Sequence, residues 1–284
     1  MRLLRVLCLF VIACGGAAPR AAPLVTVTQV GEEPWRVLRF THVAGTTERV
    51  ELRMKLRTHT LFENTVMEEG RRDVDFPTIQ ITGPLTITDV APDGSARIVL
   101  TIQDATLLDD VVDPRQRSVL QSRAAALRAR VFTVQRAPDG NVVTVGGGTE
   151  LDEALATSGV RFPDAPVGIG ASWQVTSTVV SDGVRWRRAT RYRLRDRSET
   201  SVIIDADTEL HADEQTLNAE PNATTVVKRG AGRATSHAVV PLRGIAGEAQ
   251  AESHTELDLL VTRKQLRVQA TVKADSVFSI RSAR

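Results

Sequence analysis

Arginine is concentrated in one short stretch of this 284-residue chain, VRWRRATRYRLRDR at residues 184–197. Six of its seven arginines occupy odd-numbered positions, so an extended strand would place those six on one face. Guanidinium groups arrayed in this way can bind phosphate, lipopolysaccharide or another polyanion. The alternative is that the arginines form the solvated face of an ordinary strand and pair with carboxylates on a neighbouring strand.

Carboxylates for such pairing follow directly, in ETSVIIDADTELHAD at residues 199–213. Its acidic residues occupy odd positions and its main apolar residues even ones, so a hairpin would place arginine opposite acid. The expected pairs are Arg195–Asp205, Arg193–Asp207 and Arg191–Glu209. Cross-strand pairs of this kind contribute roughly 0.2–1 kcal/mol each, which favours the structural interpretation. Three arginines are expected to remain available for an anion: Arg185, Arg187 and Arg197.

The opposite face of the same predicted hairpin is aromatic. Asp182-Gly183 is a strong two-residue turn signal. That turn places Trp173 opposite Tyr192 and brings Trp186 onto the same face. If the sheet shelters an apolar ligand, these three aromatic residues are the candidate ligand-facing side chains.

The sequence contains no signature of a common catalytic or metal-binding site. Its five histidines form neither an HxH nor an HExxH pair, and it lacks GxSxG and phosphate-loop patterns. Asp109, Asp110 and Asp113 could suggest a cation site, but adjacent carboxylates before a helix are typical of a solvated loop and cap. We therefore expect a protein that is not an enzyme, with no catalytic residue, no metal site and no cofactor.

The N-terminus has the organisation of a secretory signal. Arg2 and Arg5 form a charged region, and the apolar run that follows is too short to span a bilayer, which takes about 20 residues. The run ends in VIACG at residues 11–15, which resembles the lipobox of bacterial lipoproteins. The resemblance implies that residues 1–13 are removed and that Cys14 receives lipid, including acyl chains such as palmitate.

This N-terminal pattern also predicts location. Gly15 is not the aspartate that retains such lipoproteins in the inner membrane, so the resemblance implies an anchor in the outer membrane, facing the periplasm. Residues 14–24 are rich in glycine, alanine and proline, so we expect them to form a flexible tether. The alternative is an ordinary secretory signal cut after Ala18 or Ala22, which would release a soluble periplasmic or secreted protein.

Charge and cysteine content agree with an envelope protein. Removing Arg2 and Arg5 from the 36 basic residues leaves 34 against 34 acidic residues, which argues against a nucleic-acid partner. Cys8 and Cys14 are the two cysteines, and Cys8 leaves with the signal. The mature chain therefore has no disulfide and no thiolate metal site.

The body of the chain alternates apolar and polar residues with the period of two that is typical of half-buried strands. The clearest examples are residues 50–57, 79–87, 96–102, 255–261 and 266–280. The turn sequence APDG occurs at 91–94 and again at 137–140, and both copies predict hairpins. The polar, glycine-containing segment 214–233 is predicted to be a long loop.

Two segments break the β pattern. Asp113 as a cap and Pro114 as the first helical residue predict a central helix over about residues 114–130. The apolar face of this helix is small, so we expect it to pack across a sheet rather than lie on the membrane. A second short helix is predicted over 151–157, with Gly159 just past its end.

The segment VRFPDAPVGIGASWQV, which follows Gly159, contains a P-V-x-x-G-x-x-W pattern formed by Pro166, Val167, Gly170 and Trp173. It resembles a family of uncharacterised secreted and lipid-anchored bacterial β proteins whose second half opens with such a segment. The resemblance covers most of the mature chain loosely. It implies a β architecture and an envelope location, and it implies no activity.

These patterns together predict a mainly β protein with two similar-sized antiparallel halves, residues 25–158 and 159–284. The leading functional hypothesis is a non-catalytic cell-envelope lipoprotein, held at the membrane by its lipid anchor, with a binding or scaffolding role; an envelope protein or an apolar ligand is the expected partner. The alternative is a periplasmic carrier whose curved sheet shelters a lipid or another apolar ligand. A third hypothesis, binding of lipopolysaccharide or another polyanion, requires the arginines to stand free of Asp205, Asp207 and Glu209.

Overall fold

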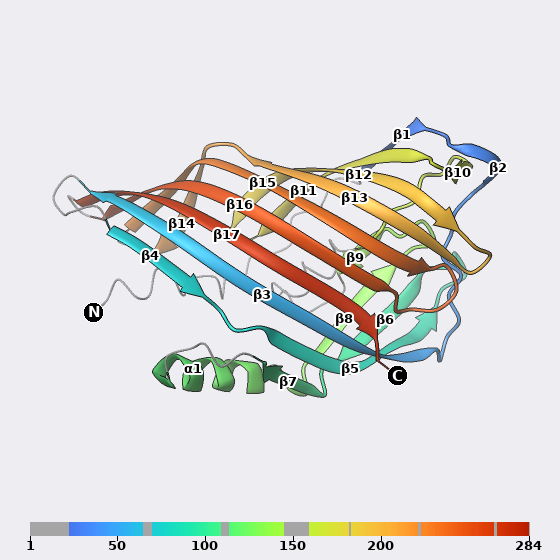
Figure 1. Ribbon diagram of the computed structural model, residues 1–284, viewed down its shortest axis with the longest axis horizontal. Helices are drawn as coiled ribbons and strands as arrows, with labels where there is room; N and C mark the ends of the chain where they lie inside the picture. The colour runs from blue at the N-terminus through green and yellow to red at the C-terminus, as the bar shows by residue number, and fades with distance from the viewer. Residues whose placement is uncertain are drawn as a thin grey trace.

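The computed structural model describes residues 23–64, 70–108, 114–144, 159–181, 183–220, 223–263 and 266–283, which form one helix and seventeen strands (Figure 1). The first elements are β1 (Leu24–Gln29), β2 (Glu32–Arg36), β3 (Thr47–Asn64), β4 (Gly70–Asp75), β5 (Ile79–Val90), β6 (Ala96–Thr101), β7 (Asp104–Leu107), α1 (Pro114–Ala125), β8 (Val131–Arg136) and β9 (Val142–Thr144). The remaining strands are β10 (Val167–Ile169), β11 (Ser172–Ser181), β12 (Val184–Arg197), β13 (Ser201–Ala212), β14 (Gln215–Glu220), β15 (Ala223–Pro241), β16 (Glu248–Arg263) and β17 (Leu266–Ser282).

Fifteen strands form one antiparallel sheet, in the order β1-β11-β12-β13-β15-β16-β17-β3-β5-β6-β8-β9, with β14 beside β15, β4 beside β3 and β7 beside β5. The C-terminal strand β17 pairs with β3 along its length, from Val268 opposite Asn64 to Ser282 opposite Val50. At one edge the N-terminal strand β1 pairs with β11. The prediction of two similar-sized halves is therefore wrong, because strands β11 to β17 of the second half form one block in a single sheet, flanked by β1 on one side and by the other strands of the first half on the other.

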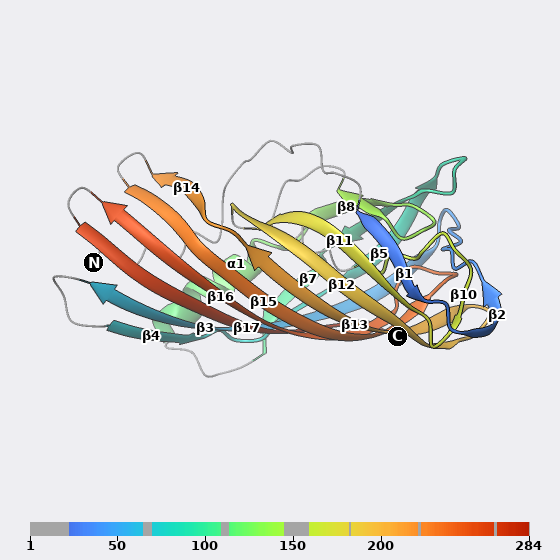
Figure 2. The same ribbon diagram turned by 90° about the horizontal axis from the view of Figure 1, so that it is seen from above.

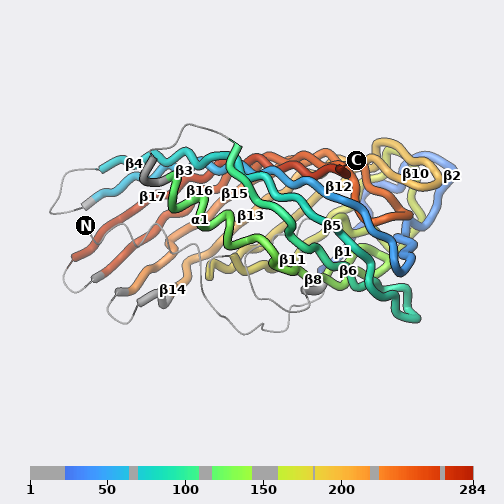
Figure 3. The backbone as a smooth tube through the Cα atoms, turned by 90° about the horizontal axis from the view of Figure 1, so that it is seen from below, coloured from blue at the N-terminus to red at the C-terminus, as the bar shows by residue number. Residues whose placement is uncertain are grey.

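The sheet is strongly curved. The long strands β3, β15, β16 and β17 run through its middle, and the strands on either side turn away from them towards the same side (Figures 1 and 2). Figure 3 shows the same curvature in the backbone, and Figure 1 shows α1 below the edge of the sheet that carries β4 and β5. The sheet thus has a convex face and a concave face, and each strand presents alternate residues to the two.

Alternation along the strands assigns side chains to these faces. On β16 the odd residues from 249 to 261 face the concave side, and they pair by register with the even residues of β17 from 268 to 280. The same face continues onto the even residues of β3 and of the C-terminal part of β15. The predicted strands at 255–261 and 266–280 are confirmed, with their apolar residues on this side.

The core lies on the concave side near one end of the sheet and under its turned edges. One cluster packs Trp173, Tyr192 and Leu194 against Leu38, Phe40 and Phe162 from the segments around β2 and before β10. Another packs Val50 and Leu52 of β3 against residues of β5, β6 and β8, with Ala124 of α1. Burial of these apolar side chains holds the curved edges in place.

Turns follow the sequence signals closely. Both APDG segments connect antiparallel strands, β5 to β6 and β8 to β9, and their glycines adopt positive φ angles of 81° at Gly94 and 84° at Gly140. Gly83 has a different role, because a Cβ there would lie 1.9 Å from the carbonyl oxygen of Thr101. The absence of a side chain at Gly83 therefore permits the close approach of β5 to the end of β6.

Of the other predictions of local structure, one is confirmed, one is wrong and some lie outside the described residues. The central helix is confirmed as α1, although it ends at Ala125 and continues as turns. The expected loop at 214–233 is wrong, because those residues contribute to β14 and β15 on either side of a short connection. The second helix, predicted at 151–157, and the signal region with Cys14 lie outside the described residues. Within the described part of the chain, no helix is long and apolar enough to cross a membrane.

Candidate functional site

The arginine-rich strand β12 lies beside the acidic strand β13, but two residues away from the predicted register. Arg193 lies opposite Asp205 and Arg191 opposite Asp207, so the three expected cross-strand pairs are wrong as aligned pairs. An irregularity between Leu194 and Asp196 shifts the chain, and Arg195 forms its ion pair with Asp205 diagonally. Arginine still meets acid, as the sequence indicates, because a slip of two residues keeps every side chain on its face.

The three arginines expected to be free occupy different environments. Arg187 forms an ion pair with Asp213 at 3.0 Å. Arg197 donates hydrogen bonds to the carbonyl oxygens of Val167 and Pro34 and so connects β12 to the small sheet of β2 and β10. The Arg185 side chain makes no hydrogen bond or ion pair with any described residue. The structure therefore does not bring the three together as one anion-binding group.

The convex face carries a network of oppositely charged side chains that pair with one another. His59 lies 2.8 Å from a carboxylate oxygen of Asp73, and His254 lies 2.7 Å from one of Asp275. Further pairs on this face are His237–Asp205, His211–Asp213, Arg57–Asp75, Lys273–Glu256 and Arg229–Asp258. Exposed pairs of this kind contribute about 0–1 kcal/mol each, so their main effects are register and solubility.

Asp205 has two basic partners on the convex face. It accepts hydrogen bonds from His237 and Arg195, which lower the pKa of its carboxyl group below the ordinary value. Asp207, two residues along the same face, makes no hydrogen bond or ion pair with a described residue. Asp205 and Asp207, for which the sequence pattern predicts equivalent cross-strand pairs, therefore differ in their contribution to stability.

The three candidate ligand-facing aromatics belong to the core. Trp173 is 0 % exposed, Trp186 6 % and Tyr192 7 %. The predicted pairing is confirmed, because Trp173 lies opposite Tyr192 and their ring centroids are 5.5 Å apart. The Trp173 indole Nε1 donates to the carbonyl oxygen of Arg161 at 2.7 Å. These rings therefore hold the sheet edge together, and their faces are covered by protein.

A half-buried pair of basic side chains, His42 and Arg136, lies in the same region and is not indicated by any sequence motif. The Arg136 guanidinium lies 4.1 Å from the centroid of the Phe40 ring, and Phe40 stacks on His42. Burial, together with the nearby Arg136 charge, lowers the pKa of His42 to about 4. Burial also lowers the pKa of Arg136 to about 10. His42 is therefore neutral near pH 7, and the pair acts as a packed structural element.

The middle of the concave face has a different composition from either edge. Where the four longest strands meet, the inward positions carry small residues: Gly232, Ala234, Ser236 and Ala238 on β15, Ala249, Ala251 and Ser253 on β16, and Ala274 and Ser276 on β17. Larger apolar residues, Leu56, Phe62, Leu257, Leu259, Val261 and Val272, continue this face towards the end that carries β4 and β14. We call the inward positions of β3, β15, β16 and β17 the central concave face.

Most side chains of the central concave face are half-buried, in contrast to the fully buried cores at its margins. Met54, which faces this side, is 43 % exposed. Among the described elements, β16 makes its extensive contacts with β15 and β17, its neighbours in the sheet. A broad apolar surface that keeps some access to solvent is typical of a binding surface.

Two polar side chains of this face that lack a hydrogen-bond partner lie at one end of it. Thr58 and Thr60 point inward from β3, and their Oγ1 atoms are buried without a hydrogen-bond partner among the described residues. Arg72 of β4 lies directly opposite Thr60 in the sheet. Sequence reasoning missed these residues, although the alternation of β3 already placed both threonines on its apolar side.

The described residues contain no group of three or more histidine, cysteine, aspartate or glutamate residues that could hold a metal ion. No protein-family model and no curated protein matches the chain. One solved structure with some similarity is that of the CymD monoaromatic hydrocarbon channel. Its TM-score is 0.14 and its sequence identity 11 %, over 85 % of this chain and 90 % of that one. A TM-score at this level carries no argument about fold or function.

Proposed function

We propose that this protein is a non-catalytic, lipid-anchored envelope protein that binds an apolar ligand on its central concave face. The carrier hypothesis and the envelope-lipoprotein hypothesis are then combined: Cys14 holds the protein at the outer membrane on the periplasmic side, and the curved sheet receives the ligand. The observation that carries the proposal is the half-buried, apolar and small-residue composition of this face on the four longest strands.

Physical reasons connect this composition with binding. Small side chains leave room above the middle of a curved sheet, whereas leucine or phenylalanine at the same positions would fill that room with protein. Apolar ligand sites are concave and mostly lined by apolar side chains, with few polar groups. The buried aromatics Trp173, Trp186 and Tyr192 lie on the same concave side, on the turned strands β11 and β12, and in this proposal they form one wall of the site without contacting the ligand.

The composition of the convex face agrees with ligand binding on the opposite, concave face. Many charges of the convex face pair with one another across the strands, which keeps this surface hydrated. Arg185, Arg191 and Arg193 form no ion pair with a described residue, but Arg191 and Arg193 lie opposite Asp207 and Asp205. Because acid lies beside most of the arginine stripe, binding of lipopolysaccharide or another polyanion there is the weaker hypothesis. A protein partner on the convex face would meet a polar, charge-balanced surface, which is a poor core for a stable interface.

Substitutions on opposite faces of β17 test the proposal. Ala274→Trp places a large ring on the central concave face, and Val277→Trp places the same ring on the convex face, where Val277 is 51 % exposed. We expect the mature chain without its lipidated Cys14 (residues 15–284, which contain every described residue) to bind the apolar dye N-phenyl-1-naphthylamine. Ala274→Trp should weaken that binding at least tenfold and Val277→Trp should leave it unchanged. Failure of the wild type to bind the dye, or equal effects of the two substitutions, would contradict the proposal.

A further inference from the structure

The inward polar groups at the β4 end of the central concave face form a small cluster. Thr60 lies opposite Arg72 in the pairing of β3 with β4, and Thr58 lies opposite Val74 two residues away. All of these residues point to the concave side, because Thr58 and Thr60 share the parity of Leu56 and Phe62. One guanidinium and two hydroxyl groups are thus adjacent on one face. We call Arg72, Thr58 and Thr60 the Arg72 cluster.

The polar groups of the Arg72 cluster lack the partners that folded proteins normally supply. Thr60 is 1 % exposed, and its Oγ1 has no hydrogen-bond partner among the described residues; the same holds for the buried Oγ1 of Thr58. Arg72 is half-buried and makes no ion pair or hydrogen bond with the described part of the chain. Buried hydroxyl groups without partners are rare and costly in native structures, which points to a ligand as the missing partner.

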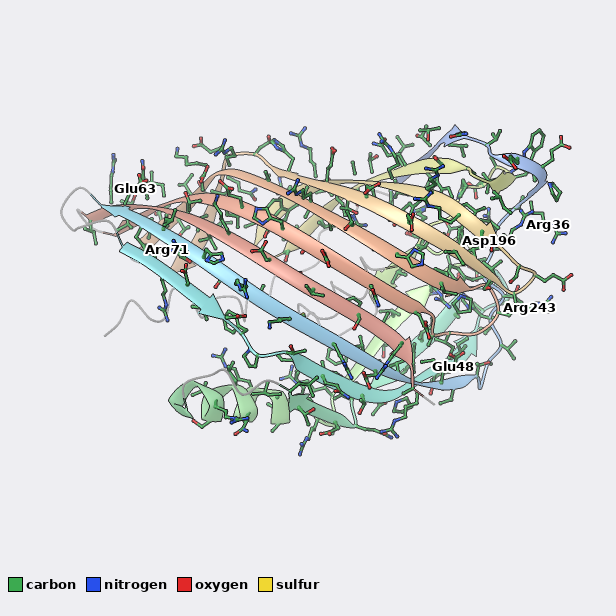
Figure 4. All side chains as sticks on the ribbon, in the orientation of Figure 1. Arg36, Glu48, Glu63, Arg71, Asp196 and Arg243 are labelled. Carbon is green, nitrogen blue, oxygen red and sulfur yellow. The ribbon has the colours of Figure 1, made fainter. Side chains whose placement is uncertain are left out.

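The convex side of the same strand provides a direct contrast. Arg71, the neighbour of Arg72, forms an ion pair with Asp73 at 2.9 Å, and Asp73 also binds His59. Figure 4 shows Arg71 and Glu63 near one end of β3, and Glu48 near its other end. Adjacent arginines on β4 thus differ: the outward one is neutralised by protein, and the inward one is not.

Negative charge is scarce on the inward side. At the described concave positions of β3, β4, β15, β16 and β17, Glu48 is the one acidic residue. It lies at the opposite end of β3, where its carboxylate accepts hydrogen bonds from the backbone amides of Ile245 and Ala246. The positive charge of Arg72 therefore faces an apolar surface with no carboxylate nearby on the described strands.

We propose that the Arg72 cluster binds the anionic head group, a carboxylate or a phosphate, of a long-chain amphiphile whose chain lies along the central concave face. The proposal rests on the proposed function and names the class of ligand. Arg72 supplies the charge and donates hydrogen bonds to the head group, and the hydroxyl groups of Thr58 and Thr60 donate two more. Charge-assisted hydrogen bonds of this kind are the strong ones in partly dehydrated sites.

The dimensions of the face suit such a chain. From Thr60 to Met54 the concave positions of β3 cover six residues, which is about 20 Å at 3.3 Å per residue. One acyl chain spans half of the hydrocarbon core of a bilayer, which is about 15 Å. Beyond Met54 the face is closed by the buried residues Leu52 and Val50. The face is therefore long enough for one acyl chain between the Arg72 cluster and the filled end.

Calorimetric titration of the mature chain with matched probes tests this inference. The probes are palmitate, hexadecyl phosphate, hexadecanol and inorganic phosphate, and the variants are Arg72→Gln and, as a control on the same strand, Arg71→Gln. We expect wild type and Arg71→Gln to bind palmitate or hexadecyl phosphate about 10–100-fold more tightly than hexadecanol, as one charge-assisted contact implies. Arg72→Gln should reduce this preference to about threefold or less while hexadecanol binding stays unchanged. The tighter of the two anionic probes identifies the head group.

The double variant Thr58→Val/Thr60→Val provides a readout that a merely structural role would not produce. Replacing two unpartnered hydroxyl groups with methyl groups of similar shape should raise the melting temperature of the free protein and weaken binding of the anionic probes. Equal binding of palmitate, hexadecyl phosphate and hexadecanol by wild type and Arg72→Gln would overturn the inference and leave the proposed function standing. Binding of inorganic phosphate as tightly as hexadecyl phosphate would also overturn it. If none of the long-chain probes binds, the proposed function itself fails.

Discussion

Replacement of Trp173 by alanine tests the packing that supports the curved edge of the sheet. The indole is 0 % exposed, its ring stacks on Tyr192, and its Nε1 donates to the carbonyl oxygen of Arg161 at 2.7 Å. Truncating a buried tryptophan to alanine costs about 3–5 kcal/mol through lost burial and the cavity that remains. The lost hydrogen bond also leaves a buried acceptor, so we expect a value near the upper end, about 5 kcal/mol.

Trp35 is a matched control, because its Nε1 also donates to a backbone carbonyl, that of Gly31 at 3.1 Å, but the residue is 51 % exposed. Trp35→Ala should cost less than about 1 kcal/mol. For a chain of this size 1 kcal/mol shifts the melting temperature by about 2–4 °C, so Trp173→Ala should lower it by about 10–20 °C. Urea unfolding followed by far-ultraviolet circular dichroism measures both variants without relying on tryptophan fluorescence. If Trp173→Ala and Trp35→Ala lowered the free energy of unfolding by amounts that agree within about 1 kcal/mol, this account of the core would be refuted.

Three further predictions concern other parts of the fold. Gly83→Ala should lower the free energy of unfolding by at least about 3 kcal/mol, because its Cβ would overlap the last carbonyl oxygen of β6. Gly70→Ala is the control, since its Cβ would meet only ordinary contacts. Urea unfolding compares the two variants, and similar losses would contradict the close approach of β5 to β6. Asp205→Asn should cost roughly 1 kcal/mol and Asp207→Asn less than half of that. Because the pKa of Asp205 is lowered, its contribution is present above the ordinary carboxyl pKa and disappears as the pH falls through the folded value, so the two variants should converge with wild type in acid. The pKa of His42 is lowered to about 4, so the protein should become less stable as the pH falls from about 6.5 to 4. Between pH 7 and pH 5 the free energy of unfolding should fall by about 2 kcal/mol. An NMR titration midpoint of His42 near 6.5 would contradict this prediction.

Local sequence signals predicted the parts of the fold that depend on neighbouring residues. The turn at Gly183 and the alternation on both sides of it predicted the pairing of Trp173 with Tyr192, and the APDG segments predicted two hairpins. The register of β12 on β13 was missed by two residues: the turn closes with Arg197 opposite Val202, which accounts for one, and the irregularity between Leu194 and Asp196 adds the other. Neither feature has a local signature in the sequence.

Long-range pairing could not be predicted in the same way. The contact of β17 with β3 joins segments more than 200 residues apart, and no feature of either strand indicates its partner. The polar and glycine-containing composition of residues 214–233 led to the prediction of a loop, although Gly230 and Gly232 of β15 lie in a strand on the concave face. The Arg72 cluster was missed for a related reason: threonine is common in strands, and only the three-dimensional structure shows that Thr58 and Thr60 lack partners.

Native mass spectrometry of the mature chain, purified from a bacterial periplasm without detergent and followed by lipid extraction, tests the central claim most directly. The account predicts one copurified long-chain amphiphile per chain in the wild type and its loss in Ala274→Trp, with Val277→Trp retaining it. An apo mass in the wild type, together with no binding of added palmitate, hexadecyl phosphate or hexadecanol, would contradict the claim that the concave face binds an apolar ligand.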